Sequence, residues 1–500
     1  MPSLLKRAMT TLTVGGLLGG LLITAPAVFA GDEQTYIVLY KQHNATGAAA
    51  LVRAAGGTLV ASYPQIGVVV ARSSDPAFAA EITRDSRIEG AGSTAGLGTQ
   101  LDADLVEGPP PGDLPNSPAS PTGETFWPLQ WDMRQIEVDG AHAITGGSPE
   151  VVVGDLDTGL DYHHPDLAPN IAWDKSASCE SGAPVTDPDA WDDHQGHGTH
   201  TAGTIAAAAN GLGTVGVAPN VKIAGIKTSN DDGYFFPEMI VCAFMWAAQN
   251  EIDVTNNSYF ADPWLYNCRN DAGQRAIWKA ESRAIRYAMQ QGVIVVASAG
   301  NSNHDLAHPE TDTISPDFPP GSEIERDITN ACIRIPAEIP GVVTVTATGA
   351  LNEKAYYSDY GVGVVDVAAP GGDRLFQVDP AAGALNGRVL STYRLEQPLS
   401  SLVLEDCVNG ECGKYAYLQG TSMAAPHVTG VVALIESRYG PLSNGSAISI
   451  LERSADEQAC PPNPFNPGPP FNFAAECQGG AGNNGFYGRG EVNAQAAVTR

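Results

Sequence analysis

The sequence predicts an α/β protein in which a parallel β-sheet is flanked by helices, with a small α+β unit in front of it. Short runs rich in β-branched residues alternate with helical stretches from about residue 150 onward. These runs look buried on both faces, which is typical of strands in a parallel sheet. A Pro-rich stretch separates them from a shorter pattern of strands and helices near the N-terminus. Because 500 residues exceed the usual size of one hydrophobic core, we expect two or more units.

The N-terminal residues 1–30 have the features of a secretory signal peptide. Lys6 and Arg7 precede an apolar run over 12–24, and Val28-Phe29-Ala30 places small residues at the two positions that a signal peptidase recognises. The apolar run is too short to span a bilayer as a permanent helix, and no later segment could replace it. We therefore expect a secreted protein, cleaved after Ala30, with no stable membrane insertion.

Residues 31–98 are predicted to form a compact α+β unit. The expected elements are a strand over 35–41, a helix over 45–55, strands over 58–63 and 67–71, a helix over 75–85 and a short final strand. This order of strand, helix, strand, strand, helix, strand is that of a ferredoxin-like unit. Residues 99–125, which are rich in Pro and Gly, are expected to form an exposed linker, because such a composition buries little apolar surface.

Residues 126–500 carry the parallel sheet. The expected strands lie at 151–156, 221–226, 252–256, 293–298 and 342–348, and the main helices at 199–209, 237–249, 272–290 and 423–438. In sheets of this kind, ligands bind beyond the carboxyl ends of the strands. Functional residues are therefore sought at strand ends and helix starts.

Charge and cysteine content limit the possible partners. The net charge of -29 argues against nucleic acid or an anionic membrane, because binding of phosphate groups needs basic patches. The eight cysteines of an exported chain suggest disulfides. Preferred pairs are Cys407 with Cys412 and Cys460 with Cys477, and then Cys268 with Cys332. Cys242, in the middle of a predicted helix, is either paired or a buried free thiol.

The most informative stretch is Gly420-Thr421-Ser422, directly before the apolar helix 423–438. A catalytic serine needs a tight turn, a helix N-terminus and a base within reach, and this stretch supplies the first two. The alternative is that Ser422 only caps the helix.

Three other polar residues lie at strand ends or helix starts. Asp157, after the strand 151–156, could orient an imidazole or lie in a turn. His197, flanked by glycines, could act as a general base, or could form a metal pair with His200, although zinc-protease helices place their ligands four residues apart with a Glu between. Asn301, at the end of strand 293–298, could stabilise an oxyanion or form an Asx-turn.

Together these residues lie in strings that resemble the subtilisin-like (subtilase) serine peptidases. The strings are Asp157-Thr158-Gly159-Leu160-Asp161, His197-Gly198-Thr199-His200-Thr201-Ala202-Gly203-Thr204, Ala299-Gly300-Asn301 and Gly420-Thr421-Ser422-Met423-Ala424-Ala425-Pro426-His427. The order Asp, His, Ser is that of the family. The resemblance covers about residue 130 to the C-terminus. It implies a subtilisin-like fold in which Ser422 attacks the peptide carbonyl, His197 transfers the proton, Asp157 holds the imidazole and Asn301 completes the oxyanion hole.

The resemblance also implies a substrate cleft, and it identifies residues 31–98 as similar to an inhibitory propeptide that assists folding. Self-cleavage is expected between Arg87 and Phe126. Where the family usually has Ser-Leu-Gly-Gly, this chain has Ser258-Tyr259-Phe260-Ala261, so Phe260 should narrow the pocket for the side chain before the cut, unless it points into the core. The substrate-binding residues implied are Gly233, Tyr234, Phe235, Ser258, Tyr259, Phe260, Ala299 and Gly300.

A structural calcium ion is implied by the same resemblance. Asp166 and Asn210 fall on calcium-ligating positions of the family, with backbone carbonyls of Ala208, Leu212 and Thr214, and oxygen ligands suit this hard cation. A second acidic stretch, Asp187 to Asp193, either binds another ion or is a solvated loop.

The function predicted from the sequence is that of a secreted, calcium-stabilised serine endopeptidase made as a self-processed zymogen, acting on proteins or peptides without a catalytic cofactor. One alternative is a narrowly specific precursor-maturation peptidase of the same fold. Another is a catalytically silent peptide-binding module, which the presence of all four site residues disfavours. The insertions 302–331 and 373–418 are candidates for lids or exosites beside the cleft.

Overall fold

The computed structural model describes residues 33–41, 45–94, 97–100, 123–469 and 472–499. The predicted signal peptide and most of the predicted linker lie outside the described residues, so their boundaries stay predictions. Within the described part of the chain, no helix is long and apolar enough to cross a membrane.

The N-terminal unit has the predicted order of elements. These are β1 (Gln34–Tyr40), α1 (Ala48–Ala54), β2 (Thr58–Tyr63), β3 (Val68–Ser73), α2 (Phe78–Ile82) and β4 (Ile88–Ser93). The strands form an antiparallel sheet in the order β2-β3-β1-β4. One face of this sheet packs on α1 and α2 around Val38, Val52 and Phe78, which are fully buried. The ferredoxin-like prediction is thus confirmed.

The C-terminal unit is built on a parallel sheet in the order β15-β14-β10-β8-β5-β7-β6. Its strands are β5 (Val152–Asp157), β6 (Ala177–Ser178), β7 (Lys222–Lys227), β8 (Val254–Asn257), β10 (Ile294–Ser298), β14 (Val343–Thr348) and β15 (Val367–Pro370). All five predicted strands are present. The edge strands β6 and β15 were not predicted, because two and four residues are too short to show a pattern.

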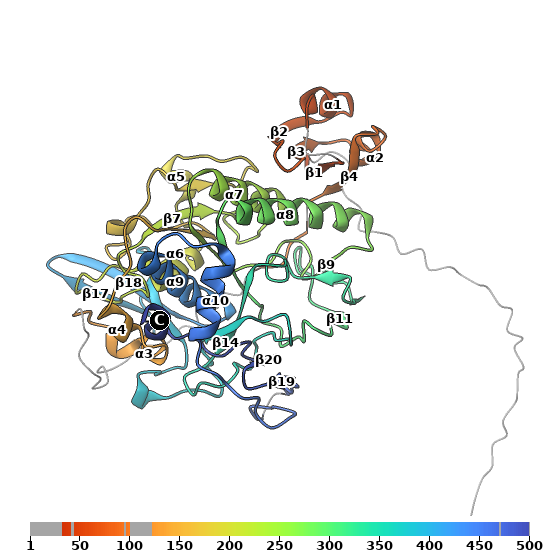
Figure 1. Ribbon diagram of the computed structural model, residues 1–500. Coiled ribbons are helices and arrows are strands. Elements are labelled where there is room, and N and C mark those ends of the chain that lie inside the picture. Colours follow the sequence, from red (N-terminus) through yellow and green to blue (C-terminus); the bar gives the residue numbers. More distant parts are fainter. Residues whose placement is uncertain (1–32, 42–44, 95–96, 101–122, 470–471, 500) are drawn as a thin grey trace, which may run out of the picture.

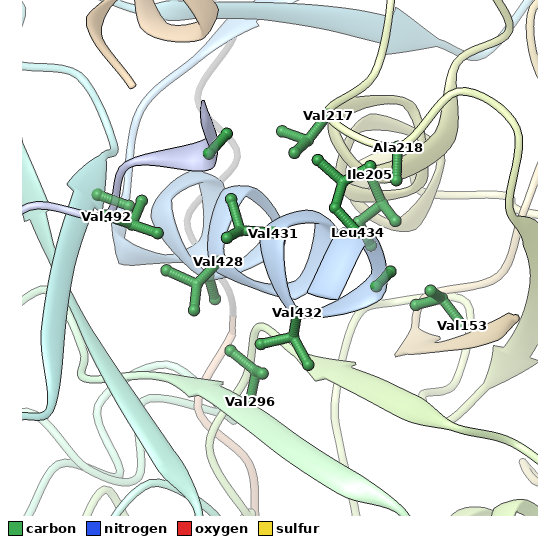
Figure 2. Close-up of a cluster of buried hydrophobic side chains, with 14 of the residues drawn as sticks. Val153, Ile205, Val217, Ala218, Val296, Val428, Val431, Val432, Leu434 and Val492 are labelled. Carbon is green, nitrogen blue, oxygen red and sulfur yellow. The ribbon is translucent and has the colours of Figure 1, made fainter. Parts of the chain in front are cut away.

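Helices cover both faces of this sheet, as the fold class requires (Figure 1). On one face lie α6 (His197–Ala206) and α9 (Thr421–Tyr439), and on the other α7 (Pro237–Gln249) and α8 (Ala272–Gln290). Figure 2 shows α9 inserted into the core, with Val428 and Val432 facing Val296 of the sheet and Leu434 near Ile205 of α6. These apolar contacts fix the position of the N-terminus of α9, where Ser422 lies.

Shorter elements surround this frame. The helices are α3 (Trp131–Gln135), α4 (Val138–His142), α5 (Pro188–Trp191), α10 (Asn444–Ser454) and α11 (Ala494–Thr499). Small antiparallel pairs are formed by β9 (Asn267–Cys268) with β13 (Cys332–Ile333), β11 (Thr311–Asp312) with β12 (Arg326–Asp327), and β19 (Gly479–Gly480) with β20 (Asn483–Asn484).

The insertion 373–418 contains a separate three-stranded sheet in the order β16-β18-β17. Its strands are β16 (Val389–Tyr393), β17 (Val403–Val408) and β18 (Glu411–Leu418). The sheet packs against α6, where Thr392 Oγ1 donates to the Thr199 carbonyl at 2.7 Å and Ser391 Oγ to the His200 carbonyl at 2.8 Å. It therefore supports the helix that carries His197.

The N-terminal unit packs on α7 and α8, above the parallel sheet (Figure 1). Apolar residues of its free face, including Leu39 and Ile66, join the core of these helices. Arg283 of α8 donates to Glu89 at 2.7 Å and to the Tyr40 carbonyl at 2.9 Å. These contacts hold the N-terminal unit against the second domain.

The disulfides confirm the three predicted pairs and resolve the open alternative for Cys242. Cys242 of α7 is bonded to Cys179, which directly follows β6. No cysteine is free in the described residues, which include all eight. The four bonds are Cys179–Cys242, Cys268–Cys332, Cys407–Cys412 and Cys460–Cys477.

Candidate active site

Ser422 is the second residue of α9, and Gly420 with φ 156° precedes the helix. The Ser422 hydroxyl donates to the carbonyl of Ser258 at 3.2 Å, and the Ser258 hydroxyl donates to the carbonyl of Ser422 at 2.9 Å. Ser422 is therefore not a capping residue, because Gly420 holds the cap position and the serine side chain bonds across to the end of β8. The site lies at the carboxyl end of the sheet, as predicted.

His197 and Asp157 form a buried pair. The His197 Nδ1 atom lies 2.7 Å from Asp157 Oδ1, which also accepts the Thr158 N–H at 2.8 Å. Asp157 ends β5 and His197 begins α6, so neighbouring elements of the core position both side chains. Gly198 must be a glycine, since a Cβ there would lie 2.2 Å from the Gly159 carbonyl oxygen.

The pKa of His197 is set by two opposing effects. Burial alone would lower it, but the charge of Asp157 and its hydrogen bond outweigh burial, so the pKa lies above its usual value of 6.5. The other ring nitrogen, Nε2, has no hydrogen-bond partner among the described residues. It is therefore free to accept a proton from a serine hydroxyl that turns toward it.

The metal alternative for His197 and His200 finds no support. The His200 Nε2 atom lies 3.0 Å from the Ala416 carbonyl of β18, and burial lowers its pKa to about 3. The described residues contain no group of three His, Cys, Asp or Glu side chains that could hold a metal ion. His200 instead fastens α6 to the sheet β16-β18-β17.

Asn301 points its side chain toward the start of α9. Its Oδ1 atom accepts the Thr421 N–H at 2.9 Å and the Thr421 hydroxyl at 2.8 Å. Because the oxygen is fixed by these bonds, the amide Nδ2 remains as a donor beside Ser422. The alternative role of Asn301 in an Asx-turn is contradicted, because its side-chain oxygen is bonded to Thr421, 120 residues further along the chain.

A buried hydrogen-bond network under the site was not foreseen from the sequence. Asp155 accepts from Asn256 Nδ2 and from Thr201 Oγ1, each at 2.8 Å, and Thr429 donates to Asn256 at 3.3 Å. These bonds join β5, α6, β8 and α9, the four elements that carry the site. Burial, and then the charge of Asp157, raise the pKa of Asp155 well above its ordinary value. Two buried Asp residues at alternate positions of one strand are the sequence signal for this network.

Asp193 fixes the loop before His197. It is 2% exposed, and its carboxylate accepts from the backbone of Gly196 at 2.8 Å and of Thr199 at 2.9 Å, and from the Thr158 hydroxyl at 3.0 Å. The sequence allowed this acidic stretch to be either an ion site or a solvated loop. Asp193 fits neither description, because it is buried and its carboxylate oxygens accept hydrogen bonds from N–H and O–H donors.

A cavity of about 260 Å³ opens beside Ser422 and Asn301. The predicted substrate residues that line it are Ser258, Tyr259, Phe260, Ala299 and Gly300. Phe260 lines this cavity and also packs on a buried cluster that includes Leu265. Its side chain therefore both contributes to the pocket wall and contacts the core, the two alternatives that the sequence allowed.

The other predicted edge, Gly233 to Phe235, does not line this cavity. Phe235 is buried and stacks on Tyr259 with ring centroids 4.5 Å apart. The Tyr234 ring lies against Gly98, where a Cβ would be 2.5 Å away. Gly98 is part of the N-terminal segment that approaches the site.

Residues 97–100 lie at the cavity, between two segments of the second domain. The Thr99 N–H donates to Asp262 at 2.7 Å, and the Gln100 N–H donates to Asp317 at 3.1 Å. Gly98 pairs with Phe318 of the insertion 302–331. Thr99 and Gln100 both line the cavity that Ser422 lines. The described segment that follows the N-terminal unit therefore ends, at Gln100, at the cavity that Ser422 lines.

Comparison with known proteins agrees with this geometry. The profile described as the Subtilase family matches residues 148–490. The chain belongs to the subtilase family. It is 31% identical over 372 residues to M-protease from Shouchella clausii (strain KSM-K16), covering 74% of this chain and 70% of that protein. It is 30% identical over 372 residues to Subtilisin BL from Lederbergia lenta, covering 74% of this chain and 98% of that protein.

The solved structures extend the likeness to the N-terminal unit. The epidermin leader peptide processing serine protease (EpiP) from Staphylococcus aureus matches with a TM-score of 0.65 and 24% identity, covering 93% of this chain and 98% of that one. Membership of the family makes this subtilase a serine endopeptidase. Because the structural match covers 93% of the chain, it also includes the N-terminal unit.

The side chains around Asp166 do not fit a calcium ion. Asp166 Oδ2 accepts the Tyr415 hydroxyl at 2.8 Å and the Thr214 N–H at 3.4 Å, while Oδ1 accepts the Asn210 amide at 3.1 Å. Asn210 Oδ1 in turn accepts the Leu212 N–H at 3.0 Å. Donors therefore already occupy the side-chain oxygens of Asp166 and Asn210 that a cation would need.

The Tyr415 ring packs against the loop that carries the other expected ligands, Ala208, Leu212 and Thr214. A Cβ at Gly213 in this loop would lie 1.9 Å from the ring of Tyr415, which belongs to the inserted sheet. Calcium in this subtilase remains a prediction from the resemblance alone, and no catalytic step uses it.

Replacing Tyr415 with Phe is expected to lower the free energy of unfolding by about 1–2 kcal/mol, because buried Asp166 loses a hydrogen-bond donor. Thermal unfolding should be measured in a Ser422→Ala background, which prevents self-digestion, with and without a chelator. A Tm that falls with the chelator but is unchanged by Tyr415→Phe would contradict this interpretation and favour calcium.

Proposed function

We propose that this subtilase is a secreted serine endopeptidase that cleaves peptide bonds through Asp157, His197 and Ser422 and an acyl-enzyme. The observation that carries the proposal is the His197 to Asp157 bond at 2.7 Å, with no partner for Nε2 in the described part of the chain and Ser422 at the start of the neighbouring helix. Asp157 holds the tautomer in which Nδ1 carries the proton, so Nε2 is the basic atom.

The reaction begins when the Ser422 hydroxyl turns from the Ser258 carbonyl to His197 Nε2. The serine oxygen attacks the substrate carbonyl while His197 takes the proton. The new oxyanion is stabilised by the Asn301 Nδ2 group and by the N–H of Ser422, which has no partner within the helix because it is the second residue. His197 then protonates the leaving amine, and water hydrolyses the acyl-enzyme by the same route.

Replacing Asn301 with Ala is expected to lower kcat by about 10²- to 10³-fold with little change in KM, because the amide donor acts on charge that develops in the transition state. Steady-state kinetics on a chromogenic peptide would measure this. A loss seen mainly in KM would mean that Asn301 binds the ground state and is not part of the oxyanion hole.

The acid limb of the pH profile should follow His197. The imidazole must be neutral to accept a proton, and Asp157 holds its pKa above 6.5, so kcat/KM should fall as the pH decreases through a midpoint above 6.5. Below this midpoint the imidazolium cannot act as a base. A midpoint clearly below 6.5 would contradict the effect of Asp157.

We also propose that the N-terminal unit is an inhibitory propeptide removed by the enzyme itself. Its support is the position of Thr99 and Gln100, which line the cavity at Ser422 and are hydrogen-bonded to Asp262 and Asp317. In purified full-length protein, the parent should convert to a mature form, whereas Ser422→Ala should stay intact until parent enzyme is added. Conversion of the purified Ser422→Ala protein alone would refute self-processing.

A narrowly specific maturation peptidase is the second candidate. The insertion 302–331 lines the cavity with Ile314 and Asp317, which restricts its shape. The structural relative EpiP is itself named as a leader peptide processing protease. Digestion of a mixed peptide library separates the candidates, since a broad enzyme cuts many sequences, a maturation peptidase cuts few, and a silent binding module cuts none.

A further inference from the structure

A buried guanidinium group lies in the cavity beside Ser422. Arg334, one residue after β13, lines this cavity and is only 2% exposed. It pairs with Asp359, and its NH2 group lies 3.2 Å from His304 Nδ1 and 3.4 Å from the Tyr266 hydroxyl. The guanidinium also stacks 4.8 Å from the centroid of the Tyr266 ring. These contacts hold the planar group in one orientation.

The donors of Arg334 are not all used. Its Nε atom is buried and has no hydrogen-bond partner in the described part of the chain. The carboxylate of Asp359 is shared, because its Oδ1 atom also accepts the N–H groups of Ser302 at 3.0 Å and His304 at 2.7 Å. A buried donor without a partner is costly, so the Arg334 guanidinium keeps unused capacity to donate a hydrogen bond.

The guanidinium lies directly against the oxyanion loop. A Cβ at Gly300 would be 1.8 Å from Arg334 NH1, so only glycine permits this approach, and the next residue is Asn301. The same cavity is therefore lined by Asn301 and Ser422 on one side and by Arg334 on another. Arg334 therefore forms part of the wall of this cavity, next to the loop that carries Asn301.

Two of the lining residues are charged, Arg334 and Asp317, while Phe260, Leu265 and Ile335 are apolar. Asp317 accepts the Gln100 N–H at 3.1 Å in the unprocessed chain. Arg334 is the only Lys or Arg among the described residues that line the cavity. A carboxylate accepts a charge-assisted hydrogen bond from a guanidinium, which is stronger than the bond that a neutral amide oxygen would accept.

We propose that the cavity binds an acidic side chain, so that this subtilase cleaves after Glu or Asp, with Arg334 as the specificity-determining residue. This inference rests on the proposed peptidase function and names its substrate class. The sequence that follows Gln100 contains residues of this type, Asp102 and Asp104.

The test uses the processed enzyme and a set of peptides that differ only in the residue before the scissile bond: Glu, Asp, Gln, Leu or Arg. The Glu peptide should have a kcat/KM about tenfold or more above that of the isosteric Gln peptide. Asp359→Asn, which keeps the acceptor oxygen but removes the competing charge, should increase this ratio.

The neutral double variant Arg334→Gln/Asp359→Asn should bring the Glu to Gln ratio to about one. The matched control is Arg326→Gln/Asp312→Asn. This variant also removes an ion pair between an Arg and a buried Asp, but neither residue of this pair lines the cavity. Its ratio should equal that of the parent.

The outcomes separate the two proposals. A parent that is labelled by a fluorophosphonate and cleaves the Leu, Gln or Arg peptide as fast as the Glu peptide overturns the acidic preference and leaves the peptidase function intact. An unchanged ratio in the double variant also overturns the role of Arg334. A processed protein that is neither labelled nor active on any peptide refutes the peptidase function, and the acidic preference with it.

Discussion

Replacing Ser422 with Ala should lower kcat on a peptide substrate by about 10⁶-fold, the loss found when subtilisin is deprived of its nucleophile. The physical reason is that no other hydroxyl takes its place. The Ser258 hydroxyl is hydrogen-bonded to Ser422, but it donates its own proton to the Ser422 carbonyl at 2.9 Å. The measurement is steady-state hydrolysis by protein whose propeptide has been removed by added parent enzyme, followed by repurification.

Ser258→Ala is the matched control for this experiment. It removes a hydroxyl from the same cavity without removing the nucleophile, and it leaves the Ser258 carbonyl in place. Its loss should be far smaller than that of Ser422→Ala. Comparable losses in the two variants would mean that Ser422 acts through the local hydrogen bonds and not as the nucleophile.

Replacing Asp157 with Asn should lower kcat by about 10⁴-fold while the protein remains folded. The amide keeps the size of the carboxylate but carries no charge to stabilise the imidazolium that forms when Ser422 is deprotonated. Where the amide nitrogen takes the position of Oδ1, the bond to the Thr158 N–H is lost and an N–H group faces His197, which forces the proton onto Nε2 and leaves no basic atom for Ser422. KM should change little, because Asp157 is fully buried and does not line the cavity.

Unfolding curves of parent and Asp157→Asn, both in inhibited form, provide the control for the second prediction. A variant that is folded and retains activity within tenfold of the parent would show that Asp157 does not set the tautomer of His197. The effect of the same change on the acid limb of the pH profile gives a further check, because the charge that raises the pKa of His197 is lost.

Most of the frame of this protein could be predicted from the sequence. The helices α7 and α8 have the predicted ends, and Asp157, His197 and Asn301 lie at strand ends or helix starts, as periodicity and turn residues indicate. These features are local, because a buried parallel strand is rich in β-branched residues and the glycines on either side of His197 mark a close approach of the backbone.

The features that could not be predicted depend on which distant residues meet. Arg334 lies in an ordinary stretch of sequence, and its role follows only from its position next to Gly300 and Asp359. Tyr415 belongs to an inserted strand, and nothing near it in the sequence indicates that it contacts Asp166. The turn residues around Ser422 likewise permitted a capping role, which the bond to Ser258 excludes.

The most direct test of the central claim is to treat the processed protein with a fluorophosphonate and to identify the modified residue by peptide mass spectrometry. A single adduct on Ser422 is predicted, whose formation slows as the pH falls and is nearly lost in His197→Ala. An adduct on another residue, or labelling of Ser422 at an equal rate in His197→Ala, would contradict the proposed mechanism.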